Sequence, residues 1–180
     1  MSSVEIVARI VSGISLLLAN AFFVTTEFAM TRVPQFERSD FQESAGLRRA
    51  WEMTDELEIY LTACQVGITV TSILLGVVFE PGVSALIEPA ILALDLPVGN
   101  MHVVAVAISV ILIQFMHTVW GEQSPTYLGV ERPVSVARYC AIPLFWWTRL
   151  TYPLIYVGDH MAKATLRVFG VEIERSWKEE

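Results

Sequence analysis

The chain has 180 residues, of which 54% are hydrophobic and only 17% are charged, and its formal net charge is -7 at pH 7. Soluble domains usually carry about a quarter charged residues. This composition therefore excludes an ordinary water-soluble domain and predicts an integral membrane protein in a lipid bilayer. The acidic balance argues against nucleic acid as a partner, because its phosphates attract clusters of Lys and Arg.

Three stretches of the chain are long and apolar enough to cross a bilayer. They are Ile10–Met30, Ile59–Phe79 and Val103–Trp120. At a rise of about 1.5 Å per residue, a helix of about 20 residues crosses a hydrocarbon core of about 30 Å. We therefore predict three membrane-spanning helices.

A shorter apolar run lies between the second and third spans. Residues Val83–Leu94 are bracketed by Pro81 and Pro97 and interrupted at Glu88-Pro89. Because this run is too short to cross the bilayer, we predict a short helical hairpin that dips into the membrane from the outer face. A soluble cap helix is the alternative.

A fourth apolar stretch, Tyr139–Gly158, has a different composition. It contains Arg149 and a cluster of aromatic side chains, which is typical of a segment lying among lipid headgroups. If it crossed the membrane, the basic residues of the tail would be translocated. We therefore predict a juxtamembrane amphipathic belt helix rather than a fourth crossing.

The distribution of Lys and Arg predicts the orientation. The connection 31–58 contains four Arg, the connection 80–102 contains no Lys or Arg, and further basic residues follow Trp120. Basic loops stay in the cytoplasm, so we expect a multi-pass protein of the cell membrane with its N-terminus outside and its C-terminus cytoplasmic.

Together these features predict an all-α membrane protein with three transmembrane helices, a short helical hairpin between the second and third, and a juxtamembrane amphipathic belt helix. The transmembrane domain is expected over residues 1–138. The belt helix and a cytoplasmic tail are expected over residues 139–180.

Polar side chains inside a spanning helix are costly unless they are paired, hydrated or bound to a ligand, so they mark candidate sites. In the first span, Asn20 and Glu27 are spaced to share one helix face, and Thr25 and Thr26 lie beside them. The alternatives are an interhelical hydrogen bond for Asn20 and an ion pair with Arg32 for Glu27.

The second span carries another polar stripe. Gln65, Thr69 and Ser72 repeat the helical spacing. Hydroxyl side chains in spanning helices often only bond to neighbouring helices, and this is the alternative for Thr62, Thr69 and Thr71.

At the end of the third span, Glu122 follows Gly121 directly, and Pro125 interrupts the helical pattern. Glycine lets the backbone leave helix geometry, which frees a carbonyl oxygen beside a carboxylate. With amide and hydroxyl oxygens, these groups form an all-oxygen set that suits hard cations such as Mg2+ and Na+ and does not suit Zn2+. We assign His117 to packing, and a position that only flanks the membrane is the alternative for Glu122.

The sequence contains no HExxH zinc motif and no phosphate-binding glycine loop. We therefore do not expect an enzyme.

Three segments resemble the membrane domain of the cyclin M (CNNM)/CorC family of magnesium transporters. They are NAFFVTTEFAMTR (20–32), YLTACQVGITVTSILLGVVFEP (60–81) and WGEQSPTYLGVERP (120–133). The resemblance covers roughly residues 4–170. It implies three transmembrane helices, a short hairpin, a belt helix and a homodimer. Family members typically continue into a cytoplasmic CBS-pair domain, and we expect residues 1–180 not to include it.

The resemblance also implies a Mg2+ ion held at mid-membrane by oxygen ligands. By motif position, the implied ligands are Asn20, Ser72, the Gly121 carbonyl and Glu122.

Other positions of these motifs carry less direct implications. Glu27 matches the acidic residue of the first-helix motif. Val24 stands where many members have a serine, so Thr25 or Thr26 is expected to replace that ligand. Thr126 stands where a lysine usually follows the proline.

The function expected from residues and resemblance together is Mg2+ transport or export by alternating access, with Na+ as the expected coupling ion. The rival expectation is a non-transporting membrane anchor or Mg2+ sensor that dimerises through its polar helix stripes.

Overall fold

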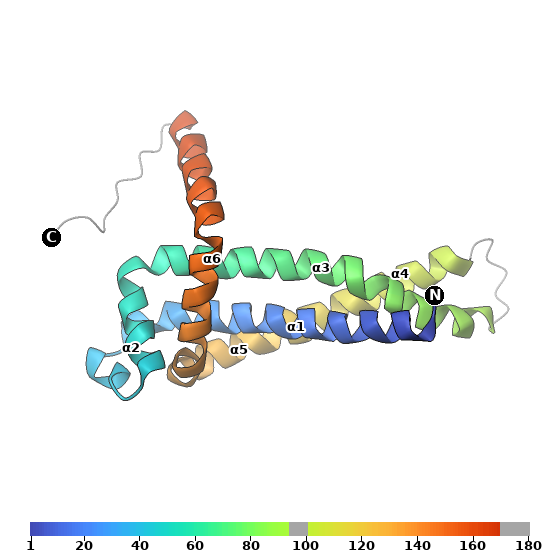
Figure 1. Cartoon of the computed structure of the whole chain (residues 1–180), viewed down its shortest axis with the longest axis horizontal. Helices are drawn as coiled ribbons and strands as arrows, with labels where there is room; N and C mark the ends of the chain where they lie inside the picture. The colour runs from blue at the N-terminus through green and yellow to red at the C-terminus, as the bar shows by residue number, and fades with distance from the viewer. Residues whose placement is uncertain (94–100, 170–180) are drawn as a thin grey trace. The chain divides into compact units, whose positions relative to one another are not determined.

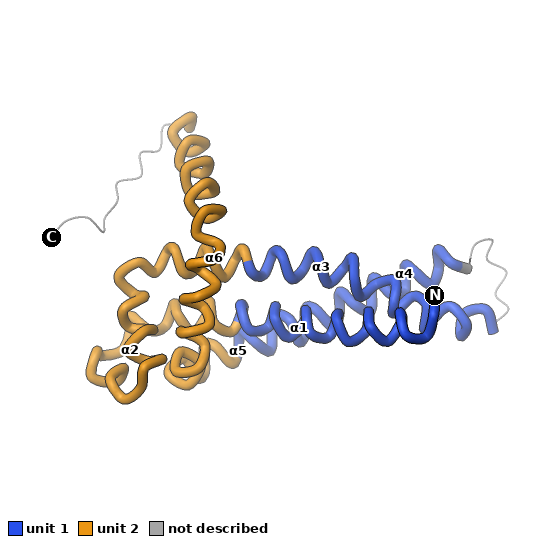
Figure 2. Tube along the Cα trace, in the orientation of Figure 1, with its two compact units in different colours: residues 1–24, 67–127 blue, residues 25–66, 128–180 orange. Residues whose placement is uncertain are grey.

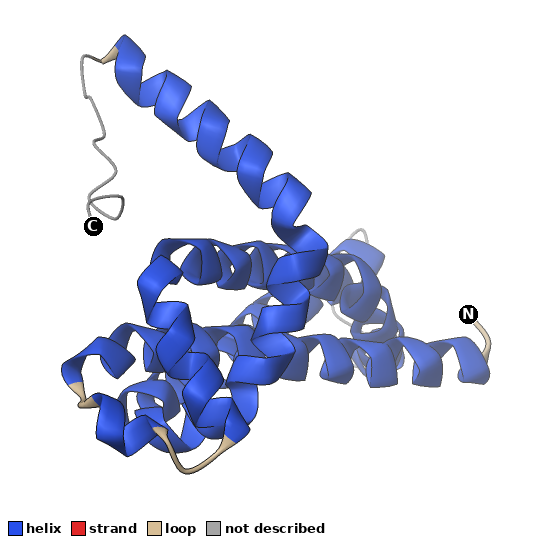
Figure 3. Ribbon diagram, turned by 60° about the vertical axis from the view of Figure 1, so that its left-hand side comes forward, coloured by secondary structure: helices blue, strands red, loops and turns tan. Residues whose placement is uncertain are grey.

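The computed structural model describes residues 1–93 and 101–169, and within these residues the chain is helical with no strand (Figures 1 and 3). The all-α prediction is confirmed. The α-helices are α1 Ser3–Arg32, α2 Ala45–Glu52, α3 Leu57–Leu92, α4 Met101–Met116, α5 Ser124–Glu131 and α6 Pro133–Val168. Three short 3-10 helices, η1 Val33–Gln35, η2 Arg38–Phe41 and η3 Met53–Glu56, and one π-helix, η4 His117–Gln123, connect them.

Three helical segments are long and apolar enough to span a membrane. They are Ser3–Gln35, Ala45–Leu92 and His102–Glu131. Each contains one of the predicted spans, so the prediction of three helices long and apolar enough to cross a membrane is confirmed, although every segment is longer than its prediction. The extra length arises because helical structure continues into the less apolar flanks of each span.

The predicted hairpin after the second span differs from the structure. Residues Val83–Leu92 continue α3 as one helix, although Pro81 and Pro89 lie inside it. Each proline removes one backbone donor, and membrane helices tolerate this loss without ending. The prediction of a separate pair of short helices is therefore wrong for residues Val83–Leu92. Leu94, the last residue of the predicted hairpin, lies outside the described residues.

The predicted belt segment lies within α6. This helix begins at Pro133, before the predicted start at Tyr139, and continues to Val168. Its buried residues repeat at helical spacing on one face, so the helix is amphipathic, as predicted. These residues include Ala137, Ala141, Leu144, Thr148 and Ile155.

The chain forms two compact units (Figure 2). Unit 1 contains residues 1–24 and 67–127, and unit 2 contains residues 25–66 and 128–180. Both α1 and α3 contribute to each unit. The division therefore follows packing along the helices rather than the order of the chain.

In unit 1, side chains from α1, α3 and α4 pack into an apolar cluster. Its buried members are Leu17, Leu75, Phe79, Val83 and Ile113. The α1 helix also presents an exposed apolar stripe at helical spacing, formed by Val4, Val7, Val11, Ile14 and Leu18. Such a stripe is typical of a helix that faces lipid or another apolar surface.

In unit 2, α2 packs against α6. Both helices contribute to a larger apolar cluster that includes Phe41 of η2, Leu47 of α2 and Leu144 of α6. The Trp147 indole N–H donates to the Ala63 carbonyl at 2.9 Å, which fixes α6 beside the first part of α3. The second half of α6 extends beyond this packed region of the unit (Figure 2).

Candidate cation site

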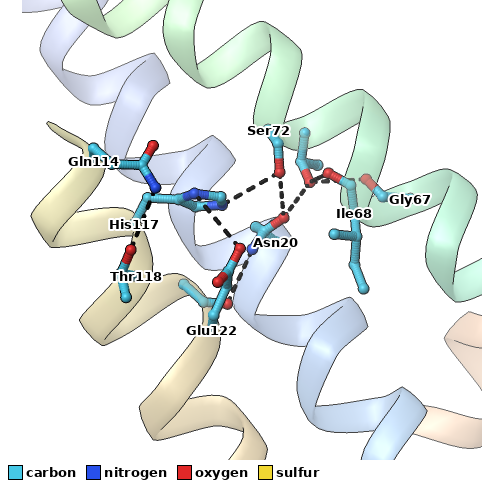
Figure 4. A network of polar contacts seen from close by, with 10 residues as sticks. Asn20, Gly67, Ile68, Ser72, Gln114, His117, Thr118 and Glu122 are labelled. Carbon is cyan, nitrogen blue, oxygen red and sulfur yellow. Dashed lines mark hydrogen bonds and ion pairs between the residues drawn. The ribbon is translucent and has the colours of Figure 1, made fainter. Parts of the chain in front are cut away.

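Asn20 lies at the centre of a polar cluster in unit 1 (Figure 4). Its side chain is fully buried, with 0% exposure. Its amide N–H donates to the Gly121 carbonyl at 2.9 Å, and its amide oxygen accepts from the Thr71 hydroxyl at 2.9 Å and the Ser72 hydroxyl at 3.2 Å. One side chain of α1 therefore links α3 and η4.

The Gly121 carbonyl is available because of the local sequence. In an α-helix it would accept from the N–H four residues later, and that residue is Pro125, which has no N–H. The chain forms the π-helix His117–Gln123 at this point, and such wider turns are frequent at functional sites. The predicted departure from regular helix geometry at Gly121 is confirmed, although helical structure resumes in α5.

His117 extends the cluster toward Glu122. Its Nε2 lies 3.2 Å from the Ser72 hydroxyl, and its Nδ1 lies 3.8 Å from a Glu122 carboxylate oxygen. The His117 side chain is 11% exposed and the Glu122 side chain is 48% exposed. The carboxylate therefore lies at the open edge of a cluster whose other side chains are largely buried.

We call this group the Asn20 cluster, and its members are Asn20, Thr71, Ser72, His117, Gly121 and Glu122. A cavity of about 140 Å³, the His117 cavity, lies against it. The residues around the cavity include Ser72 and His117 of the cluster, and Gly76, Glu80 and Gln114. The cluster therefore borders a space large enough for water or a small ion.

The Thr71 hydroxyl can donate its hydrogen bond to any of three acceptors. The Thr71 hydroxyl lies within hydrogen-bond distance of Asn20, of the Gly67 carbonyl at 2.8 Å and of the Ile68 carbonyl at 3.1 Å. A hydroxyl has a single hydrogen, so these contacts compete. When the hydrogen points to a backbone carbonyl, the Thr71 oxygen and the Asn20 oxygen both keep lone pairs for another ligand.

No group of three or more His, Cys, Asp or Glu side chains suited to a metal ion occurs among residues 1–93 and 101–169. Glu122 is the carboxylate of the Asn20 cluster, and the other oxygens are neutral. This donor set matches hard cations that accept amide, hydroxyl and carbonyl oxygens.

The structure brings four predicted ligands together: Asn20, Ser72, Gly121 and Glu122. The other three, Thr25, Thr26 and Glu27, belong to unit 2.

The surroundings of those three residues are packing contacts. The Thr25 carbonyl lies 2.5 Å from the position that a Cβ on Gly129 would occupy, so α1 and α5 approach closely there. Thr26 is fully buried and forms a side-chain hydrogen bond with Cys140. Burial raises the pKa of the Cys140 thiol, and this hydrogen bond opposes the rise. Glu27 accepts from the Gln65 amide at 3.5 Å.

Two members of the cluster, Thr71 and His117, are not among the ligands predicted from sequence: packing between helices is the alternative given for Thr71, and His117 is assigned to packing. Thr71 lies beside Ser72, and a hydroxyl in a spanning helix carries no sign of which helix it faces. His117 lies four residues before Gly121, which places both on one helix face. That spacing was the available signal for including His117.

A comparison with protein-family models decides the family. Residues 12–179 match the cyclin M transmembrane N-terminal domain. This chain belongs to the cyclin M transmembrane domain family. Membership and the three apolar segments together make it a multi-pass membrane protein.

Several bacterial proteins are similar over most of the chain. UPF0053 protein YhdP of Bacillus subtilis (strain 168) is 34% identical over 87% of this chain and 36% of its own length. UPF0053 protein YhdT of the same organism is 35% identical over 87% of this chain and 34% of its own length. Uncharacterized protein Rv1841c of Mycobacterium tuberculosis (strain ATCC 25618 / H37Rv) is 32% identical over 93% of this chain and 48% of its own length. The chain therefore spans about a third to a half of these relatives.

Proposed function

We propose that this chain is the membrane domain of a Mg2+ transporter and that the Asn20 cluster binds the transported ion. The observation that carries the proposal is Asn20 itself, a fully buried amide in contact with groups from two other helical segments. Family membership supports a role in divalent cation transport or sensing. Mg2+ is proposed because the cluster offers oxygen ligands, one of which is a carboxylate.

The spacing of the oxygens supports this ion. Mg2+ binds six ligands in an octahedron at about 2.1 Å, so neighbouring ligand oxygens lie about 3.0 Å apart. The Asn20 amide oxygen lies 2.9 Å from the Thr71 hydroxyl and 3.2 Å from the Ser72 hydroxyl. The hydrogen-bonded pairs therefore need only turn their hydroxyl hydrogens away to present lone pairs to one ion.

Alternating access is the proposed mechanism. The ion would reach the cluster from one side of the membrane at a time, and the His117 cavity provides one approach to Ser72 and His117. The predicted orientation and homodimer are part of the proposal, as is Na+ as the coupling ion, because Na+ accepts the same oxygen ligands.

A second candidate is the non-transporting anchor or sensor. It is favoured by the hydrogen bonds of Asn20, whose amide oxygen and amide nitrogen both have partners. In this case the cluster would only hold helices together, and the melting temperature of the chain would not respond to millimolar Mg2+ or Na+.

Proteoliposomes that contain the 180-residue chain test the proposal. We expect Mg2+ flux in the wild type and a loss of about tenfold or more in Glu122→Gln, because this variant removes the charge but keeps the shape of the side chain. A tenfold loss corresponds to about 1.4 kcal/mol of binding free energy. Glu131→Gln is the matched control, because this exposed carboxylate lies at the end of α5. Unchanged flux in Glu122→Gln would remove the carboxylate from the mechanism, and no flux in the wild type would favour the anchor or sensor.

A further inference from the structure

Two buried polar atoms of unit 1 lie outside the Asn20 cluster and lack hydrogen-bond partners. Among residues 1–93 and 101–169, the buried side-chain polar atoms without a partner are a carboxylate oxygen of Glu80 and the hydroxyl of Ser84. The two residues are one helical turn apart on α3, so they lie on one face. Buried polar atoms without partners are costly, and their coincidence on one face points to a ligand.

The Ser84 hydroxyl differs from other hydroxyls in helices of this chain. Ser15, Ser109 and Thr148 each donate to the carbonyl four residues earlier, at 2.9, 2.7 and 2.9 Å. This is the usual partner of a hydroxyl inside a helix. Ser84 is only 4% exposed, yet its hydroxyl makes no such bond. Its oxygen therefore remains available.

Both atoms belong to residues that line a second cavity, of about 400 Å³, which we call the His102 cavity. Glu80 also lines the His117 cavity, so this residue borders both spaces. Ala85 and Glu88 lie on the wall of the His102 cavity as well. Pro89 has no N–H to donate to the Ala85 carbonyl, which repeats the relation between Pro125 and Gly121.

Among residues 1–93 and 101–169, Glu80 forms no ion pair with the basic groups near it. The N-terminal residue Met1 lines the His102 cavity together with Glu80, but no ion pair joins the two residues. His102 lies 3.7 Å from Glu88. Arg9 passes close to α3, since its β-carbon lies 3.0 Å from the position that a Cβ on Gly82 would occupy, but its guanidinium pairs with Glu5 at 3.4 Å. Within the part of unit 1 that the structure describes, the Glu80 carboxyl group therefore has no ion-pair partner, and Glu80 lines both cavities.

We propose that Glu80, Ser84 and Glu88 form a second cation site, for a hydrated divalent cation, on the face of α3 that lines the His102 cavity. Mg2+ usually keeps several of its waters and binds through one or two carboxylates, and a cavity of about 400 Å³ has room for an ion with water ligands. The site is separate from the Asn20 cluster and does not depend on the role proposed for Glu122.

Mn2+ binding to the purified 180-residue chain in detergent micelles tests this site, because free Mn2+ has an electron paramagnetic resonance signal that broadens when the ion binds. We expect two classes of Mn2+ site in the wild type. Glu80→Gln should weaken one class about tenfold or more, and Ser84→Ala should weaken the same class about threefold, since affinity follows ligand charge and number. Glu131→Gln is the matched control, because this exposed carboxylate lies at the end of α5 and lines neither cavity.

Glu122→Gln separates this proposal from the preceding one. Glu122→Gln should abolish Mn2+ binding to the other class of site and leave binding to the class that depends on Glu80 unchanged. If Glu122→Gln left both classes unchanged while Glu80→Gln weakened one, the proposed function would be contradicted and the second site would not. If Glu80→Gln and Ser84→Ala both bound Mn2+ with the same affinities as the wild type, the proposal of a second site would be overturned.

Melting without divalent cations provides the structural control. Ser84→Ala should melt no lower than the wild type, because the variant removes a hydroxyl that has no partner. A lower melting temperature would show that the hydroxyl has a structural role and would also overturn the proposal.

Discussion

Asn20 and Glu27 lie on the same helix, α1, and the sequence makes both of them candidate cation ligands. Their surroundings differ. Asn20 is fully buried and has hydrogen-bond partners on α3 and η4, whereas Glu27 is half-buried and accepts from Gln65 at 3.5 Å. The comparison teaches that a polar residue in a spanning helix is a stronger candidate for an ion ligand when oxygens of other helices lie around it. Charge alone is a weaker indicator than convergence.

The largest effect is expected from removing the central amide. Asn20→Ala should abolish at least about nine-tenths of Mg2+ flux, because a tenfold loss requires only about 1.4 kcal/mol. It should also lower the free energy of unfolding by about 2 kcal/mol, since three interhelical hydrogen bonds contribute about 0.6 kcal/mol each. Flux assays and chemical denaturation in micelles would measure both quantities.

Ser15→Ala is the control for this variant, because Ser15 lies on the same helix and its hydroxyl bonds only to the Val11 carbonyl. If Asn20→Ala and Ser15→Ala had equal flux, the Asn20 cluster would not be the ion site.

A smaller effect is expected from crowding the cluster. A Cβ on Gly121 would lie 2.7 Å from the His117 ring and 3.2 Å from the Asn20 amide nitrogen. We expect Gly121→Ala to reduce flux severalfold and to cost about 1 kcal/mol of stability, at the lower end of overpacking effects, because the nearest atom belongs to a rotatable side chain.

Gly76→Ala is the matched variant, because a Cβ on Gly76 meets nothing within 4 Å. Alanine is favoured over glycine inside a helix by about 1 kcal/mol, so this variant should melt slightly higher than the wild type. Equal flux and equal melting temperatures in Gly121→Ala and Gly76→Ala would show that Gly121 is not packed against the cluster.

His117 is expected to have an intermediate role, because it lies between the Ser72 hydroxyl and the Glu122 carboxylate. His117→Gln keeps a polar group at this position but alters both contacts, so we expect flux to fall about twofold to fivefold, equivalent to less than about 1 kcal/mol. A titration of flux against Mg2+ concentration would show the change as weaker apparent affinity. Wild-type affinity in the variant would return His117 to the packing role predicted from sequence.

The smallest effect is expected at Glu27. Glu27→Gln should leave Mg2+ flux within about twofold of the wild type, because its hydrogen bond to Gln65 has a length of 3.5 Å and isolated bonds of this kind contribute about 1 kcal/mol or less. A loss as large as that of Glu122→Gln would erase the difference between the two regions and would restore Glu27 as a ligand.

The sequence carries enough information for the three crossings, because hydropathy and length follow from the thickness of the bilayer alone. It misses the continuation of α3 beyond Pro81, since the same proline can end a helix or be tolerated inside one. The predicted span ends at Phe79, so Glu80 lies outside it in the sequence analysis, and its place beside two cavities could not be predicted.

The candidate site was predicted in part. The Gly-Pro spacing of Gly121 and Pro125 identifies a free carbonyl from local geometry, and Asn20 stands out as an amide in an apolar span. Thr71 could not be assigned to the cluster, because which face of a helix meets a partner helix depends on packing between segments far apart in the chain. For His117 the spacing to Gly121 indicates a shared helix face, but it does not show that this face meets α1 and α3.

The central claim is that the oxygens around Asn20 bind a divalent cation, and an anomalous difference map of crystals grown with Mn2+ tests it most directly. The account predicts a peak in unit 1 bounded by the Asn20 amide oxygen, the Ser72 hydroxyl, the Gly121 carbonyl and the Glu122 carboxylate. A map with no peak among these four groups, and with the Asn20 hydrogen bonds to Gly121 and Thr71 unchanged, would contradict it.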